Sequence, residues 1–127
     1  MNEGESRIAG ILQQLINQTR AGEIRWTQSA PSIFSFVKNS REGEIITSIQ
    51  CVPRLPSSAA AMVLSPETIR DHYVLNVSKN ETPEQKLLVN IQSSEKRDLQ
   101  KHLHNLYNLI VAAEDIRTAN LLEQIYS

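Results

Sequence analysis

The sequence has little cysteine, little glycine and few aromatic residues, and each shortage excludes a class of protein or site. Cys51 is the only cysteine among 127 residues, so neither an internal disulfide nor a cysteine zinc cluster can form. The four glycines, at positions 4, 10, 22 and 43, are not clustered into a phosphate-binding loop. Because aromatic residues make up only 5% of the chain, we expect an aliphatic core.

Long apolar runs and an excess of one charge are also missing. No stretch of 18 apolar residues occurs, so no membrane-spanning helix is predicted. The first residues are acidic and polar, unlike a secretory signal, and we therefore expect a cytoplasmic protein. The formal net charge of −1 disfavours a nucleic-acid partner, because the small basic patch of Lys96, Arg97 and Lys101 is diluted by Glu95 and Asp98.

The sequence does contain a clear succession of helical and extended patterns. Apolar residues recur at helical spacing near the N-terminus and predict a helix over about 6–21. Ser6 is its expected N-cap, and Gly22 lies where a helix commonly ends in a left-handed residue. The period then changes to two, and Ile24 and Trp26 indicate a short first strand.

Two hairpins are predicted in the middle of the chain. The first joins a strand at 33–37 to a strand at 45–51 through a turn rich in Asn, Ser and Gly. The second joins a strand at 72–78 to a strand at 87–92, each with one apolar and one largely polar face. Such alternation is typical of an antiparallel sheet with one side in water.

The last helical region begins after Ser93 or Ser94, either of which is a suitable N-cap. No glycine or proline interrupts it before Tyr126, and one helix of that extent would be about 45 Å long at about 1.5 Å per residue. Because this exceeds what a five-stranded sheet can cover, we expect a break or bend near 114–118. Its apolar positions are Leu99, Leu103, Leu106, Tyr107, Ile110, Leu121, Leu122 and Ile125.

Together these elements predict a single α+β domain over residues 1–127. An antiparallel sheet of about five strands would have the N-terminal and C-terminal helices packed on one face. A long irregular connection at about 53–69, marked by prolines, interrupts the pattern without dividing the domain.

The long connection carries the candidate contact residues for a partner. Its apolar side chains either fold back over the edge of the sheet or form a surface that binds another protein. Within it, residues 65–67 read Ser-Pro-Glu and predict a short turn of helix. The candidate contact residues are Leu55, Met62, Val63, Leu64 and Ile69.

No catalytic, metal or cofactor site is predicted. Cys51 and His72 could approach if the third and fourth strands pair, but their alternation places them on opposite faces. His102 and His104 are two residues apart on a helix and so point about 200° away from each other, whereas two helical metal ligands need a spacing of three or four.

The N-terminal motif carries a resemblance to a known group of proteins. After an amphipathic helix, residues 19–26 read T-x-x-G-x-I-x-W, and Leu106-Tyr107 lies in the last long helix. This resembles small uncharacterised bacterial proteins in which such a segment precedes a β-meander and a closing helix. The resemblance implies an α-β-α arrangement in a bacterial cytosol, and it brings no catalytic residues and no settled activity. We interpret Trp26 itself as a core anchor.

These observations favour a non-catalytic protein–protein interaction module over an enzyme. It would bind a protein partner or a second copy of itself through a sheet edge, the long connection or the solvated sheet face. The alternative is a small-ligand-binding protein or minor enzyme with a pocket between sheet and helices, which convergent polar groups would reveal.

Overall fold

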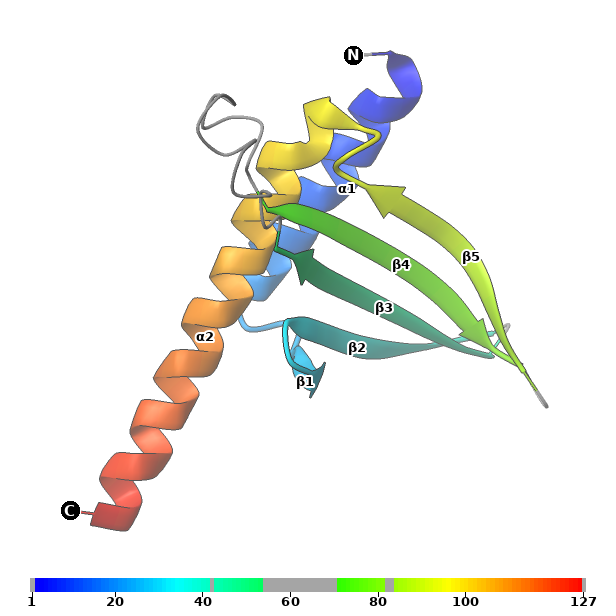
Figure 1. The fold of residues 1–127 in the computed structure, drawn as a ribbon. Helices are drawn as coiled ribbons and strands as arrows, with labels where there is room; N and C mark the ends of the chain where they lie inside the picture. The colour runs from blue at the N-terminus through cyan, green and yellow to red at the C-terminus, as the bar shows by residue number, and fades with distance from the viewer. Residues whose placement is uncertain (1, 42, 54–70, 82–83, 127) are drawn as a thin grey trace, which may run out of the picture.

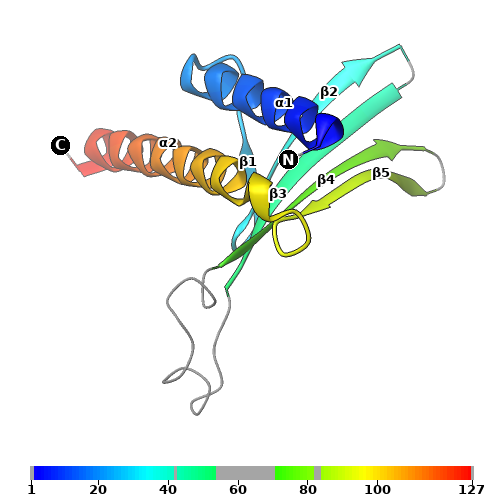
Figure 2. The same cartoon turned by 90° about the horizontal axis from the view of Figure 1, so that it is seen from above.

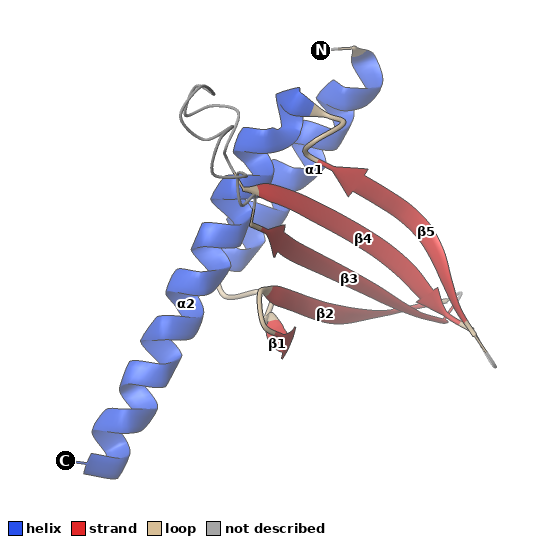
Figure 3. Ribbon diagram, viewed as in Figure 1, coloured by secondary structure: helices blue, strands red, loops and turns tan. Residues whose placement is uncertain are grey.

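The computed structural model describes residues 2–41, 43–53, 71–81 and 84–126 (Figure 1). In this part of the chain a helix is followed by five strands, a 3₁₀ helix and a longer helix. The strands form one antiparallel sheet in the order β1-β2-β3-β4-β5, and both helices lie on one side of it (Figures 2 and 3). The predicted α+β fold is thus confirmed. None of the described helices is long and apolar enough to cross a membrane.

Helix α1 (Glu3–Arg20) begins three residues earlier than expected. Its N-cap is Asn2, whose side-chain oxygen accepts a hydrogen bond from the backbone N–H of Glu5 at 2.8 Å. Ser6 lies inside the helix, so its prediction as N-cap was wrong. Asn2 is as good a cap as Ser6, and it adds a first turn with two glutamates that suit the positive end of the helix dipole.

The C-terminal end of α1 is fixed by Gly22, as the sequence predicted. Gly22 has a φ of 78°, a left-handed conformation that glycine adopts without strain. Its N–H donates to the carbonyl of Thr19 at 3.1 Å, and the N–H of Glu23 donates to the carbonyl of Gln18 at 2.9 Å. This pair of bonds turns the chain sharply away from the helix and toward the sheet.

The sheet contains both predicted hairpins, β2 with β3 and β4 with β5, joined by pairing of β3 with β4. The first strand lies later than expected: it begins at Thr27, so Ile24 and Trp26 precede it. Trp26 is only 2% exposed because the chain leaving α1 directs its side chain into the core before any strand pairing begins. The strands are β1 (Thr27–Ala30), β2 (Ile33–Ser40), β3 (Gly43–Val52), β4 (His72–Asn80) and β5 (Gln85–Gln92).

The last helical region is continuous. The 3₁₀ helix η2 (Arg97–Leu99) leads into α2 (Gln100–Tyr126), and the expected break near 114–118 does not occur. Glu114 pairs with Arg117 at 2.9 Å across one turn, which stabilises the helix where a new start was expected.

The predicted serine cap of this region was also wrong. Lys96 is the N-cap residue of η2 and makes no side-chain capping bond. The hydroxyl of Ser93 instead accepts the backbone N–H of Tyr73 at 2.8 Å, which ties the end of β5 to the start of β4.

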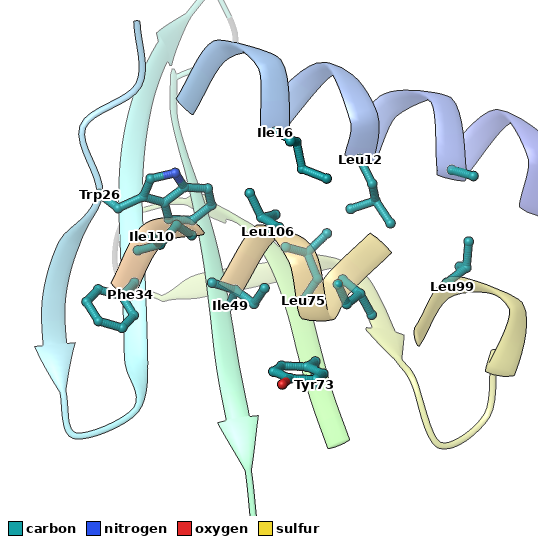
Figure 4. Packing of buried hydrophobic residues seen from close by; sticks show 12 residues of the cluster. Leu12, Ile16, Trp26, Phe34, Ile49, Tyr73, Leu75, Leu99, Leu106 and Ile110 are labelled. Atoms are coloured by element: carbon teal, nitrogen blue, oxygen red, sulfur yellow. The ribbon is translucent and has the colours of Figure 1, made fainter. Parts of the chain in front are cut away.

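The core forms where the apolar stripes of α1 and α2 meet the inner face of the sheet (Figure 4). Leu12 of α1 and Leu103 of α2 are 1% and 0% exposed, so both helices do bury their stripes on the same side. Full burial of such a side chain stabilises the fold by roughly 1.5–3 kcal/mol. The buried apolar residues are Ala9, Leu12, Ile16, Trp26, Phe34, Ile49, Tyr73, Leu75, Leu99, Leu103, Leu106 and Ile110.

Trp26 explains the T-x-x-G-x-I-x-W segment as a structural unit. Its indole N–H donates to the hydroxyl of Thr19 at 2.9 Å in a buried contact, and Gly22 makes the turn that brings the two together. The ring meets Phe36 edge-on, with centroids 4.6 Å apart. Its backbone carbonyl accepts from Arg117 of α2 at 3.2 Å, so this one residue joins α1, the sheet and α2.

Candidate functional site

The five apolar residues of the long connection lie outside the described residues. The same holds for the short helix expected at residues 65–67. The connection leaves the described chain after Pro53 and rejoins it at Asp71, beside the paired ends of β3 and β4. The candidate contact residues in question are Leu55, Met62, Val63, Leu64 and Ile69.

A polar cluster lies at this same end of the sheet, around Tyr73. The Tyr73 hydroxyl is 2.7 Å from Nδ1 of His104, and Nε2 of His104 is 2.9 Å from the side-chain nitrogen of Asn108. A neutral imidazole has one N–H, so Asn108 donates to Nε2 and Nδ1–H donates to the tyrosine oxygen. Cys51 lies opposite Tyr73 in the register of β3 and β4, and its thiol donates to Asp71 at 3.7 Å.

The electrostatics of this cluster oppose nucleophilic chemistry. Burial and the negative charge of Asp71 raise the pKa of the Cys51 thiol. Burial, with the charges of Cys51 and Asp71, raises the pKa of Tyr73 to about 12. Both groups are therefore protonated near neutral pH, and a protonated thiol is a poor nucleophile. What the cluster does is hold α2 against β4, because its bonds join side chains of the two elements.

Cys51 and His72 do not form a pair. Cys51 lies opposite Tyr73 in the β3–β4 register and His72 lies opposite Val52, so the two side chains are on opposite faces of the sheet. The histidine that reaches the cluster is His104, from α2. Among the described residues, no group of three or more His, Cys, Asp or Glu side chains is arranged to hold a metal ion.

The sheet face opposite the helices carries a row of uncharged polar side chains. The strand register aligns Ser35, Ser48, Asn76 and Asn90 across four strands. Asn90 donates to Asn76 at 2.6 Å and accepts from Gln92 at 3.0 Å. These amides satisfy one another, and no described helix covers them (Figure 2), as expected for a face in water.

The third candidate surface is the end of α2, which we call the α2 extension and define as residues 118–126. Figure 1 shows α2 running well past the sheet, and every residue of the extension is exposed. Four large side chains on it are between 49% and 82% exposed. At 100° per residue they occupy one side of the helix, and Asn120, Glu123 and Gln124 occupy the other. The four are Leu121, Leu122, Ile125 and Tyr126.

The apolar side of the extension continues the buried stripe of α2. Leu121 follows Leu103 by 18 residues, which is five turns of 3.6 residues, and Ile125 follows Tyr107 by the same interval. Leu103 is fully buried whereas Leu121 is 57% exposed, although both point to the same side of one helix. Arg117, which contacts the carbonyl of Trp26, marks where the covered part ends.

No family of known proteins, no curated protein and no solved structure matches the chain. The choice among the three surfaces therefore depends on their geometry. The groups of the polar cluster bond to one another, as do the amides of the row, whereas the extension exposes apolar surface. Sequence reasoning noted its leucines but expected the helix to bend there, and the 18-residue spacing was the signal that could have identified it.

Proposed function

We propose that the chain is a non-catalytic protein–protein interaction module of a bacterial cytoplasm, and that it binds its protein partner through the apolar side of the α2 extension. A single observation carries the proposal: a one-sided apolar helix continues past the domain with nothing described against it. Partner proteins commonly recognise such helices by inserting the apolar side into a groove or against another helix.

The size of the exposed surface supports this role. Leu121, Leu122, Ile125 and Tyr126 together expose on the order of 400 Å². Monomeric proteins rarely expose contiguous apolar patches beyond a few hundred square ångströms. At roughly 25 cal/mol per Å², burying this patch would contribute about 10 kcal/mol before the costs of association, which are about 4–15 kcal/mol. A contact of moderate affinity is therefore expected.

The alternative of an enzyme or ligand-binding protein has less support. Its best candidate is the cluster around Tyr73, where Tyr73 is already hydrogen-bonded to His104. The Cys51 thiol and the Tyr73 phenol have raised pKa values, so both stay protonated near neutral pH. Because Tyr73 is 3% exposed, a substrate would have to displace packed side chains to reach it.

The test is site-specific photocrosslinking on the full chain. A photoreactive amino acid at Leu122 would contact the partner, whereas the same group at Asn120 would face away from it. We expect a discrete adduct from position 122 in cell lysate, much less from position 120, and loss of the adduct in Ile125→Glu. Equal labelling at both positions, or none at 122, would count against the proposal.

A further inference from the structure

Strand β5 forms one edge of the sheet, and no described strand pairs with its outer side, which we call the β5 edge (Figures 1 and 3). Within its residues, Gln85–Gln92, the one charged side chain is Lys86, and no proline occurs. Three consecutive large apolar side chains, Leu87, Leu88 and Val89, are between 41% and 57% exposed. Another strand can pair with an apolar edge of this kind unless the chain protects it.

The opposite edge of the sheet is protected in a way that β5 is not. Strand β1 has four residues, none of them large and apolar, and its pairing with β2 is irregular between Gln28 and Ala30. In β5 the two features that discourage pairing are confined to one end, namely Lys86 and a bulge at Leu88, which has no partner opposite it in β4. Residues 89–92 carry neither feature and pair regularly with β4.

The hydrogen bonds at the end of β5 show which of its backbone groups face outward. The N–H of Ser93 donates to the carbonyl of Tyr73 at 2.9 Å, so the backbone of Ser93 is turned toward β4. Successive residues of a strand turn their backbone groups to alternate sides. Ile91 is therefore also turned toward β4, whereas Gln92 and Asn90 are turned away from it.

One of these outward groups is already used by the chain. The carbonyl of Gln92 accepts the N–H groups of Glu95 and Lys96, at 3.1 and 2.9 Å, in the turn that follows β5. The N–H of Gln92 and both backbone groups of Asn90 are left facing outward. A single residue of an adjacent strand can bond to both groups of Asn90 at once.

We propose that the β5 edge binds an extended segment of another protein, which adds a sixth, antiparallel strand to the sheet. An extended backbone presents its donors and acceptors at the spacing of a strand edge, so the outward groups select the conformation of the occupant. All described strand pairs of the sheet are antiparallel, the more stable arrangement per residue. The β5 edge and the α2 extension lie on opposite sides of the molecule (Figures 1 and 2), so binding here does not depend on the proposed function.

The side chains of β5 define the chemistry of this segment. Ile91, Val89 and Lys86 lie on the helix side of the sheet, because their partners are alternate residues of β4 that share a face with the buried Leu75. A sixth strand would place apolar side chains beside Ile91 and Val89 and a carboxylate beside Lys86. Lys86 has no ion pair among the described residues, so its charge is available. The matching segment is free of proline and reads apolar-x-apolar-x-acidic.

Titration of the isotope-labelled full chain with a synthetic peptide, followed by amide chemical shifts, tests the pairing. The probe is Thr-Val-Thr-Val-Thr-Glu-Thr with blocked ends, which places its third residue opposite Asn90 and its Glu opposite Lys86. We expect a Kd on the order of 100 µM, with shifts at 88–92 and none on the opposite edge at 27–30.

Methylation of the peptide backbone distinguishes strand pairing from nonspecific apolar contact. A methyl group on the amide nitrogen of the third residue, which faces Asn90, should weaken binding at least about tenfold, because it removes a donor and blocks the approach of the strand. The same group on the amide nitrogen of the next residue faces away from β5 and should leave the affinity unchanged. This comparison uses the unaltered chain and so does not depend on whether a variant folds.

Asn90→Pro and Asn90→Ala form the matched pair on the chain. Proline removes the outward N–H without removing a bond to β4, and it should weaken binding at least about tenfold. Alanine keeps that N–H and removes the side chain that bonds to Asn76, so it should bind as the original chain does. Lys86→Glu should weaken binding of the probe, and a probe with Lys in place of Glu should restore it.

Several outcomes would overturn the sixth strand. These are no shift at about 1 mM peptide, shifts confined to other parts of the chain, or equal binding by the two methylated peptides. Equal loss in Asn90→Pro and Asn90→Ala would assign the binding to the side chain and overturn it as well. Concentration-dependent shifts at 88–92 without peptide would show that a second copy occupies the edge, and would overturn a segment of another protein as its occupant.

Discussion

Helix α2 has two regions that look alike in sequence and differ in what covers them. In the first, Leu103 and Tyr107 pack against the sheet and α1; in the second, Leu121 and Ile125 point the same way into water. The side chains in both regions are large and apolar and point to the same side of the helix. The difference arises because α1 and the sheet pack on the first region and do not extend to the second. An apolar stripe on a helix therefore predicts that another surface packs against it. Only the structure shows whether that surface belongs to the same chain.

The comparison separates stability from recognition. Side chains in the covered region should determine whether the chain folds, and those in the extension should determine what it binds. Paired substitutions can test this separation, since several residue types occur in both a buried and an exposed position.

The largest difference is expected between Leu103→Ala and Leu121→Ala. The first leaves a cavity in the core and should lower the free energy of unfolding by about 2–5 kcal/mol. The second removes an exposed side chain and should change it by less than about 0.5 kcal/mol. Urea denaturation measures both. Similar losses in the two variants would contradict the division of α2 into two regions.

A second pair compares threonines. Thr19→Val removes the acceptor of the buried Trp26 N–H and should cost about 1–3 kcal/mol of stability. Thr118→Val makes the same change on the exposed extension and should cost close to nothing. Thermal unfolding followed by tryptophan fluorescence reports on both. An unchanged midpoint for Thr19→Val would show that the indole N–H finds another acceptor.

A third pair compares two tyrosines, Tyr73 and Tyr126, by the pH dependence of stability. The pKa of Tyr73 is raised to about 12 in the folded chain, while in the unfolded chain a tyrosine ionises near its ordinary value of 10. The stabilisation is therefore complete below about pH 10 and is lost as pH rises to about 12, by up to roughly 2 kcal/mol. The raised pKa of Cys51 acts in the same direction above pH 9.

Tyr73→Phe should accordingly flatten the decline of stability between pH 10 and pH 12. Tyr126→Phe, at an exposed position, should leave the decline as it is. Urea midpoints measured at pH 8, 10 and 11.5 distinguish the two. The same slope in all three chains would mean that Tyr73 does not carry the dependence.

The smallest effect is expected at the boundary of the two regions. Arg117→Ala loses a bond to the carbonyl of Trp26 and a pair with Glu114, both partly exposed, and should cost about 0.5–1 kcal/mol. Arg117 contacts the rest of the domain immediately before the extension begins. Its loss should therefore speed amide hydrogen exchange at 114–126 more than elsewhere. Gln124→Ala, which lies C-terminal to Arg117 in the extension, is the control and should speed exchange only locally.

Much of the fold could be predicted because each element carries its own period. The stripe of α1, the Gly22 end and both hairpins follow from local spacing and turn chemistry. The start of α1 was wrong because Asn2 and Ser6 are both good caps, and only the added turn of helix decides between them. Trp26 was predicted to lie in a strand because Ile24 and Trp26 alternate with polar residues, as side chains in a strand do. The same alternation arises here in a loop that directs Trp26 into the core.

The site was harder to predict. We expected α2 to bend because we assumed that a sheet must cover a helix along its whole length, and the extension breaks that assumption. The contact of Tyr73 with His104 was not foreseen either, because it joins residues 31 positions apart through the packing of α2 on the sheet. Alternation alone did place Cys51 and His72 on opposite faces correctly.

The position of Leu103, Leu106 and Ile110 at the centre of the core has a consequence for how the protein is made. A ribosome releases all five strands before these residues emerge, so α1 is the one described helix then available to cover Phe34, Ile49 and Leu75. Arg117 then reaches back 91 positions to Trp26. The core therefore cannot close until α2 has been synthesised, and strands whose apolar faces are uncovered are prone to aggregate until then.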